Sequence, residues 1–179
     1  MSYYVYWFPD NTVLINFACV SRLDLLEQIL RGRGRWTEAI AEEAKRSARI
    51  YPDLDSIARD AWLGDPIEVW EPNDILTIER IRRAAFGGTV DKPMKHLGEA
   101  QTCHVIRTNP VYAQSFWITD DHDAAEYAKR QGITTRDTMD LMSEGVQDGC
   151  CTRDEGFKLL EEMAQMGRAI RVPRHPSDL

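Results

Sequence analysis

Carboxylate side chains follow two of the most apolar runs in this sequence. Asp10 comes one proline after residues 3–8, and an acidic cluster that includes Asp121 and Asp123 comes directly after residues 116–119. In open parallel sheets, ligands bind beyond the carboxyl ends of the strands. If both runs are strands of one parallel sheet, these acids are expected at the same edge of it.

Two further acids lie in predicted helices. Glu43 comes six residues after Thr37, and Glu99 lies in the run Leu97-Gly98-Glu99-Ala100. Neighbouring helix positions differ by about 100°, so the pattern leaves open whether Glu42 or Glu43 faces inward. Taken singly, each of these acids is an ordinary helix cap or a solvated position. The functional interpretation therefore depends on the whole set.

Four or five carboxylates in one cleft repel one another, so at neutral pH they take up protons or bind cations. Oxygen ligands without His or Cys partners favour Mg²⁺ or Mn²⁺ over Zn²⁺. Two such ions, about 3.5–4 Å apart, can clamp the attacking water and the leaving oxygen of a phosphodiester. The set thus favours a nuclease, although a net charge of −7 argues against binding nucleic acid by bulk electrostatics alone.

The elements that must position these acids alternate between short apolar runs and helical patterns. This alternation is typical of an α/β protein with a mainly parallel sheet. Ser21 is a plausible cap for the helix that follows it, and the aromatic residues Trp7, Phe8 and Trp117 are expected in the core. We expect strands at residues 3–8, 35–37, 66–70, 114–119 and 133–135, and helices at residues 21–30, 38–50, 53–62, 73–86, 95–107, 120–131, 137–147 and 152–166.

At 179 residues, the chain is about one domain long and shows no repeat, low-complexity block or linker. We expect a single domain over residues 1–179, with a core at about 3–135, C-terminal helices at about 137–167 and a loose tail at 171–179. Residues 3–8 are too short for a membrane helix and lack the basic flank of a signal peptide. The four cysteines have no CxxC spacing, so we expect reduced thiols in a cytoplasmic protein.

Four motifs, in order, resemble those of PIN domains, the fold of VapC-type toxin ribonucleases. The resemblance covers most of residues 3–135 and implies a three-layer α/β/α fold around a mainly parallel sheet. Two positions depart from the commonest pattern: Asn11-Thr12, where many relatives begin with Thr or Ser, and Gln101, where others have a further acid. The matching motifs are Asp10-Asn11-Thr12-Val13-Leu14, Thr37 with Glu43, Leu97-Gly98-Glu99-Ala100, and Ile118-Thr119-Asp120-Asp121-His122-Asp123.

The resemblance implies an endoribonuclease that depends on Mg²⁺ or Mn²⁺, is often a homodimer, and is often held inactive by a cognate antitoxin protein. Its substrate would be RNA, and no membrane partner is expected. By this pattern Asp120 is a cap or an outer group, not a ligand. The implied catalytic metal ligands are Asp10, Glu43, Glu99 and Asp121, with Asp123 as an accessory ligand and Asn11 and Thr119 as groups that orient carboxylates or water.

The substrate contacts are less specific in the sequence. Arg31, Arg33 and Arg35 form the densest basic loop, expected next to the acidic edge, and are interpreted either as a rim for RNA phosphates or as an ordinary solvated loop. His122 is interpreted as a polar helix residue in preference to a general acid.

Three other interpretations compete with the nuclease. A haloacid-dehalogenase-like phosphatase also has an Asp after its first strand, but it needs a second Asp two residues later, where this chain has Thr12. A nucleotide-binding fold needs a glycine-rich phosphate loop, which is lacking here. The remaining alternative is a PIN-like module that binds RNA or a protein without cutting, and the sequence leaves it open.

Overall fold

The computed structural model describes residues 5–179, and a three-stranded parallel sheet lies at the centre of this part of the chain. The strands are β1 (Trp7–Pro9), β2 (Phe116–Ile118) and β3 (Thr134–Arg136), in the order β1-β2-β3. Trp7 lies beside Phe116, which in turn lies beside Thr134. Residues 33–35 extend the sheet, because Trp7 exchanges two backbone hydrogen bonds with Arg33 and Arg35. The expected first strand is thus confirmed only at its end, and its residues 3 and 4 lie outside the described part.

Helices make up most of the remaining described chain. They are α1 (Asn11–Cys19), α2 (Leu23–Leu30), α3 (Glu38–Ser47), α4 (Asp55–Asp60), α5 (Pro72–Phe86), α6 (Leu97–Thr108), α7 (His122–Arg130), α8 (Thr138–Gln147) and α9 (Arg153–Gln165), with short 3₁₀ turns at Pro52–Leu54 and Pro176–Asp178. Within residues 5–179, none of them has the length and apolar character needed to cross a bilayer.

Three local expectations were wrong. Ser21 does not cap α2: its φ is +53°, and the cap position belongs to Arg22, which makes no side-chain capping bond. The strand expected at residues 66–70 is reduced to one bridge between Thr37 and Ile67. The sequence pattern also gave no separate helix for residues 11–19, where α1 begins directly after Asp10.

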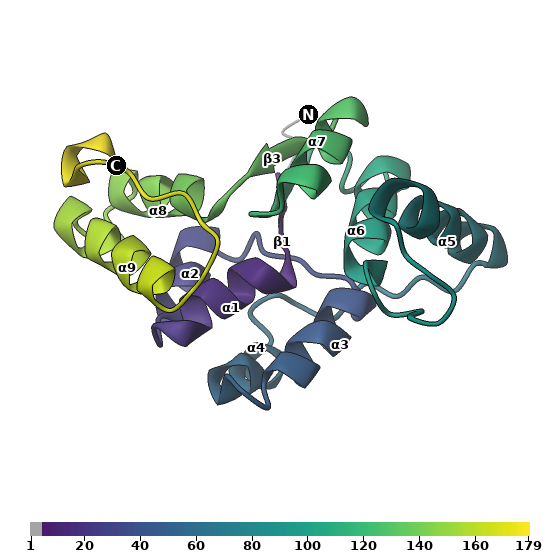
Figure 1. Ribbon diagram of the computed structural model, residues 1–179, viewed down its shortest axis with the longest axis horizontal. Helices are drawn as coiled ribbons and strands as arrows, with labels where there is room; N and C mark the ends of the chain where they lie inside the picture. Colours follow the sequence, from purple (N-terminus) through teal and green to yellow (C-terminus); the bar gives the residue numbers. More distant parts are fainter. Residues whose placement is uncertain (1–4) are drawn as a thin grey trace.

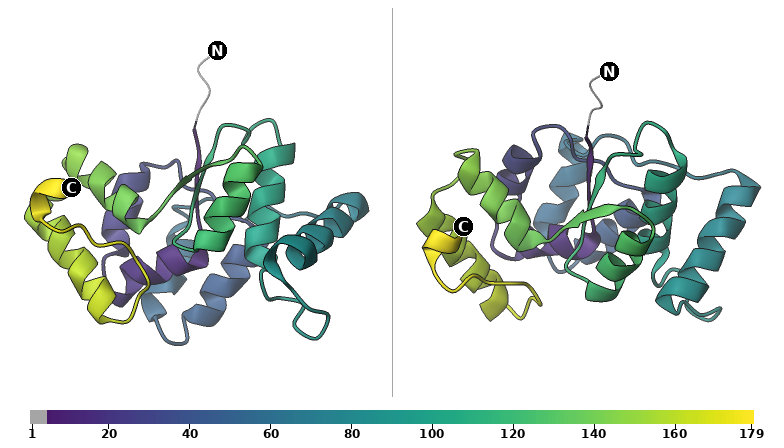
Figure 2. Two further views of the ribbon diagram at one scale, coloured as in Figure 1. Left: turned by 45° about the horizontal axis from the view of Figure 1, so that its top comes forward. Right: turned by 90° about the horizontal axis from the view of Figure 1, so that it is seen from above.

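Alternate strand residues enter different cores, so helices cover both faces of the sheet (Figures 1 and 2). Trp7 and Ile118 pack with α1, α2, α3, α8 and α9. Phe8 and Trp117 pack on the opposite face, with α6 and α7. Each of these four strand side chains is at most 2% exposed. The fold is therefore the expected three-layer α/β/α arrangement.

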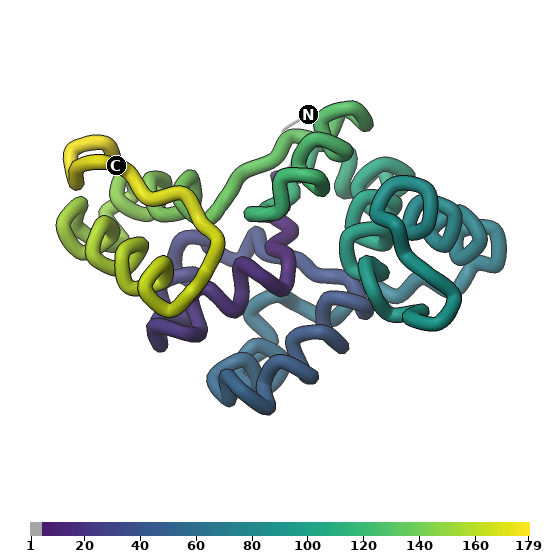
Figure 3. Tube along the Cα trace, viewed as in Figure 1, coloured from purple at the N-terminus to yellow at the C-terminus, as the bar shows by residue number. Residues whose placement is uncertain are grey.

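The two ends of the molecule are helical, with α8 and α9 at one end and α5 and α6 at the other (Figure 1). After α9 the chain turns back toward the beginning of α8 (Figure 3), where the guanidinium of Arg171 forms ion pairs with Asp137 and Asp140. Leu179 is only 6% exposed and joins the core beside α9. The C-terminal segment was expected to be loose, but these contacts hold it against the fold.

Replacing Leu26 with Ala tests the larger core. Leu26 lies on α2 and is fully buried, so the substitution removes apolar contacts and leaves a cavity. We expect the free energy of unfolding to fall by about 2–5 kcal/mol, measured by urea denaturation. Gln28→Ala, at an exposed position of the same helix, is the matched control and should change it by less than about 0.5 kcal/mol. Similar losses in the two variants would contradict the packing of α2.

Candidate active site

Asp10 occupies the turn between β1 and α1 and is buried, with 5% of its surface exposed. Its backbone N–H donates to the carbonyl of Ile118 over 2.8 Å, which continues the β1–β2 pairing. One carboxylate oxygen caps α1 by accepting from the backbone N–H of Asn11 over 2.7 Å. The other accepts from the hydroxyls of Thr12 and Thr119, each over 3.3 Å. The strand-end geometry thus fixes Asp10 at the carboxyl edge of the sheet, as expected.

Glu43 and Glu99 share this region with Asp10. Burial, and after it the nearby charge of Glu99, raises the pKa of Asp10 to about 7. Burial, followed by the charges of Asp10 and Glu99, raises the pKa of Glu43 to about 8. Three carboxylates that are far apart in the sequence therefore lie close together, and the charge of Glu99 acts on both Asp10 and Glu43.

Of the two neighbouring glutamates on α3, Glu43 faces the acids. Thr37 caps this helix, and Glu43 follows in its second turn. Glu42 is exposed, and its Oε1 lies 3.9 Å from Nζ of Lys45. The structure thus shows that Glu43, and not Glu42, faces the other acids, which helical periodicity could not decide.

Gly98 allows the first turn of α6 to approach α3 closely. A Cβ atom at this position would lie 2.5 Å from Cδ1 of Ile40 and 3.0 Å from Oε1 of Glu43. The backbone of Gly98 also forms a hydrogen bond with the Glu43 carboxylate. Glu99 follows immediately, and its Oε1 lies 3.0 Å from Nδ1 of His96. A glycine before Glu99 is therefore required by the close approach of the two helices.

Asp121 lies at the exposed rim of the same edge. Its carboxylate caps α7 by accepting from the backbone N–H of Ala124 over 2.9 Å. Its own backbone N–H donates to the Thr119 hydroxyl over 3.2 Å, and that hydroxyl in turn donates to Asp10. Asp123, in the first turn of α7, has a side chain that is 97% exposed. The structure thus links Asp121 to Asp10 through one threonine, whereas Asp123 points into solvent.

Asp120 was expected to be a cap or an outer group, and it does not cap α7. Its carboxylate accepts hydrogen bonds from Asn16, at 2.9 Å, and from the backbone and hydroxyl of Thr138, at 3.0 and 2.6 Å. These bonds join the end of β2 to α1 and α8. Sequence reasoning missed Asn16, although a polar residue among the apolar positions of α1 was an available signal.

The basic loop does not lie beside the acids. The guanidinium of Arg33 stacks over Trp7 at 4.7 Å, and that of Arg35 stacks over Tyr6 at 4.6 Å. Arg31 forms an ion pair with Asp148 at 2.9 Å. These partners place the loop at the amino end of β1, because its backbone pairs with Trp7. The expected position at the acidic edge was wrong, and RNA contact by this loop stays a prediction.

The chemistry of the donor set suits a hard divalent cation. Besides the carboxylates, Oδ1 of Asn11 is buried without a hydrogen-bond partner in the described part of the chain, while its Nδ2 donates to Ser47. Within residues 5–179, no three His, Cys, Asp or Glu side chains are arranged closely enough to hold a metal ion. Glu99 is held by His96, and Asp121 is held as a helix cap. A cation would have to replace such protein partners.

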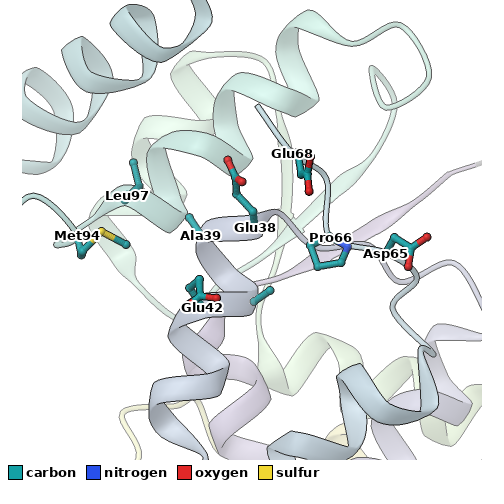
Figure 4. Close-up of a pocket in the computed structure, with 9 residues that line it drawn as sticks. Glu38, Ala39, Glu42, Asp65, Pro66, Glu68, Met94 and Leu97 are labelled. Carbon is teal, nitrogen blue, oxygen red and sulfur yellow. The ribbon is translucent and has the colours of Figure 1, made fainter. Parts of the chain in front are cut away.

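A cavity of about 900 Å³ lies between α3, residues 65–68 and the start of α6 (Figure 4). Four acids, Glu38, Glu42, Asp65 and Glu68, line it, and none of the proposed metal ligands does. Its negative charge makes it unsuitable for a phosphate backbone. We therefore do not assign it to the acidic site.

The raised pKa values predict a stability that falls as the pH rises. Asp10 and Glu43 ionise at a higher pH in the folded chain than in the unfolded chain, so the unfolded state is favoured progressively between about pH 4 and pH 8. Glu43→Gln should therefore stabilise the protein more at pH 8.5 than at pH 5, by roughly 2–3 kcal/mol in urea unfolding with chelator present. Glu42→Gln is the control. A pH-independent effect of Glu43→Gln would contradict the shared burial.

The two neighbours of Asp121 should differ sharply in their effect on stability. Asp120→Ala leaves Asn16 and Thr138 without their buried acceptor, and we expect a loss of about 2–4 kcal/mol in urea unfolding. Asp123→Ala removes an exposed side chain and should change stability by less than about 0.5 kcal/mol. Equal effects would show that Asp120 does not carry the link between α1 and α8.

Comparison with known proteins agrees with the fold. A family model described as a PIN domain matches residues 7–174. No curated protein and no solved structure matches the chain. PIN domains are typically nucleases, which is the hydrolase class at a coarse level, and they generally use divalent metals. Since the match spans nearly the whole chain and includes all the acids described above, this protein belongs to the PIN domain family.

Proposed function

We propose that this PIN domain is an endoribonuclease that depends on Mg²⁺ or Mn²⁺. The observation that carries the proposal is the convergence of buried Asp10 with the half-buried Glu43 and Glu99, which follow β1 and lie in α3 and α6. Folding gains nothing from bringing like charges together in a region of low polarity. Such a group is expected where a ligand of opposite charge binds.

The residues divide into those that hold the cation and those that position them. Asp10, Glu43 and Glu99 would bind it from inside the site, and Asp121 would bind it from the rim. Thr119 would orient Asp10 through its hydroxyl, as the 3.3 Å contact indicates. Asn11 would offer the unpartnered oxygen of its side chain to the cation or to a water. Asp123 would contribute only from a distance, because its side chain is exposed.

When bound, a divalent cation neutralises the charge on the phosphodiester and makes water a stronger acid. The carboxylates of the site accept hydrogen bonds from the attacking water and orient its oxygen toward phosphorus. Hydrolysis forms a new oxygen–phosphorus bond and breaks the bond to the 3′ oxygen. The expected products therefore carry a 5′-phosphate and a 3′-hydroxyl.

The alternative is a PIN-like module that binds RNA or a protein without cutting. The buried acids favour the nuclease, because a pure binding surface has no need of them. Control by a cognate antitoxin, and assembly as a homodimer, remain predictions from the resemblance to VapC-type toxins. Activity measured on the isolated chain tests cleavage independently of either partner.

Cleavage of a mixed pool of single-stranded RNA tests the proposed function. We expect cleavage in Mg²⁺ or Mn²⁺, loss of cleavage with excess chelator, and products with 5′-phosphate ends. Asp10→Asn and Glu99→Gln should each lower the rate about 100-fold or more, because each removes a charged ligand. Glu42→Gln, which changes an exposed acid on α3, should leave the rate within about twofold.

A binding measurement separates a lost site from an unfolded variant. Millimolar Mn²⁺ should raise the melting temperature of the wild-type protein and of Glu42→Gln, but not that of Asp10→Asn. Circular dichroism of each variant checks that it is folded. RNA binding without cleavage in either metal, together with no thermal response to Mn²⁺, would support the non-catalytic module instead.

A further inference from the structure

A groove of about 510 Å³ lies beside Asp121, on the side of the acidic site that faces α7 and the C-terminal segment. Thr119, which donates to Asp10, also lines this groove, so the groove and the acids are continuous. Arg136, Arg168 and Arg171 contribute its basic side chains, and Asp120, Asp121, Asp137 and Asp140 contribute four carboxylates. Arginine is well suited to bind phosphate, because its guanidinium presents several N–H donors in one plane.

Arg171 is already neutralised. Its guanidinium pairs with Asp137 and Asp140, and these two carboxylates hold its pKa well above the ordinary value. Its bonds attach the segment after α9 to the beginning of α8. Arg171 is therefore interpreted as a structural residue that holds the C-terminal segment, and not as a phosphate contact.

Arg168 is oriented by the protein without being neutralised by an ion pair. Its Nε donates to Oδ1 of Asn16 over 2.6 Å, and within residues 5–179 it has no carboxylate within ion-pair distance. The charge of Arg168 acts on Asp120, but that carboxylate already accepts hydrogen bonds from Asn16 and Thr138. The terminal nitrogens of Arg168 therefore keep their donors for a ligand in the groove.

Arg136 provides a second charge at the same groove. It is exposed, its guanidinium lies 5.2 Å from the centre of the Phe116 ring, and it has no ion pair in the described part of the chain. An arginine whose guanidinium stacks on an aromatic ring can still bind phosphate through the N–H groups on its outer side. Two unneutralised arginines therefore line a groove that leads to the acids.

We infer that this groove binds the phosphate backbone of the RNA strand next to the cleaved bond, with Arg168 as the main contact and Arg136 as the second. This inference rests on the proposed function, because it assigns the path of that substrate. Two other surfaces are less suitable. The cavity in Figure 4 has four acids and no basic side chain among the described residues that line it, and Arg31, Arg33 and Arg35 lie at the amino end of β1.

Fluorescence anisotropy with a labelled 12-nucleotide RNA tests this path at several salt concentrations, in chelator so that no cleavage occurs. Arg168→Gln should weaken binding about tenfold and reduce the slope of log affinity against log salt by about 0.7, the value expected for one phosphate contact on a single strand. Arg136→Gln should act in the same direction. With Mn²⁺ present, Arg168→Gln should raise KM and leave kcat within about twofold.

Two controls separate charge from structure. Arg153→Gln changes an exposed arginine at the start of α9, about 20 Å along the helix from the groove end, and should bind RNA like wild type. Arg168→Lys loses the bond to Asn16 but keeps the charge, so it should retain most of the salt slope. If Arg168→Gln is unfolded by circular dichroism, the slopes of Arg136→Gln and Arg168→Lys decide the inference.

The possible failures are distinguishable. Wild-type protein that cleaves RNA, with unchanged affinity and salt slope in both arginine variants, would overturn the groove and leave the nuclease intact. Equal losses in Arg153→Gln would also overturn it, because they would indicate diffuse attraction. Wild-type protein that neither binds nor cleaves RNA would overturn the groove and the proposed function together.

Discussion

The hydroxyl of Thr119 holds together the two strand ends on which the acidic site depends. It donates to Asp10 at the end of β1 and accepts from the backbone of Asp121 at the beginning of α7. Because the two strands are parallel and adjacent, these residues meet at one edge of the sheet although they are far apart in the sequence. Glu43 on α3 and Glu99 on α6 then extend toward this edge of the sheet. Thr119, with only 2% of its surface exposed, thus connects the buried acid Asp10 to Asp121 at the rim.

Much of this arrangement was predictable, because the strongest signals were local. Aromatic runs before acids gave β1 and β2, and the order of the strand ends gave the shared edge. Glu43 could not be separated from Glu42 by periodicity, since only the approach of Gly98 shows which side of α3 faces the acids. Asp120 and Asp121 had the same difficulty: both follow a strand, and only the contacts with Asn16 and Thr138 reveal which one caps α7 and which one binds α1 and α8.

The basic loop shows where sequence reasoning reached its limit. Three alternating arginines predict a positive surface, but their position depends on which end of β1 the loop joins. Residues 33–35 pair with Trp7, so the loop is fixed at the amino end of β1. Its arginines contact the rings of Trp7 and Tyr6 and the carboxylate of Asp148. Arg168 had no motif at all. It lies far along the chain in a connection after α9, and only the tertiary bond to Asn16 brings it to the edge of the site.

Gly98 has a consequence for the dimensions of the site. The distance between α3 and α6 is limited by the backbone, because no side chain separates Gly98 from Ile40 and Glu43. Even a methyl group there would move the helices apart and widen the space between Glu43 and Glu99. Smaller ions demand shorter and stricter oxygen distances than larger ones. If the acids bind a cation as proposed, the preferred ion size is governed in part by a residue that has no functional group. That residue is then a place where ion selectivity can be changed without altering a ligand.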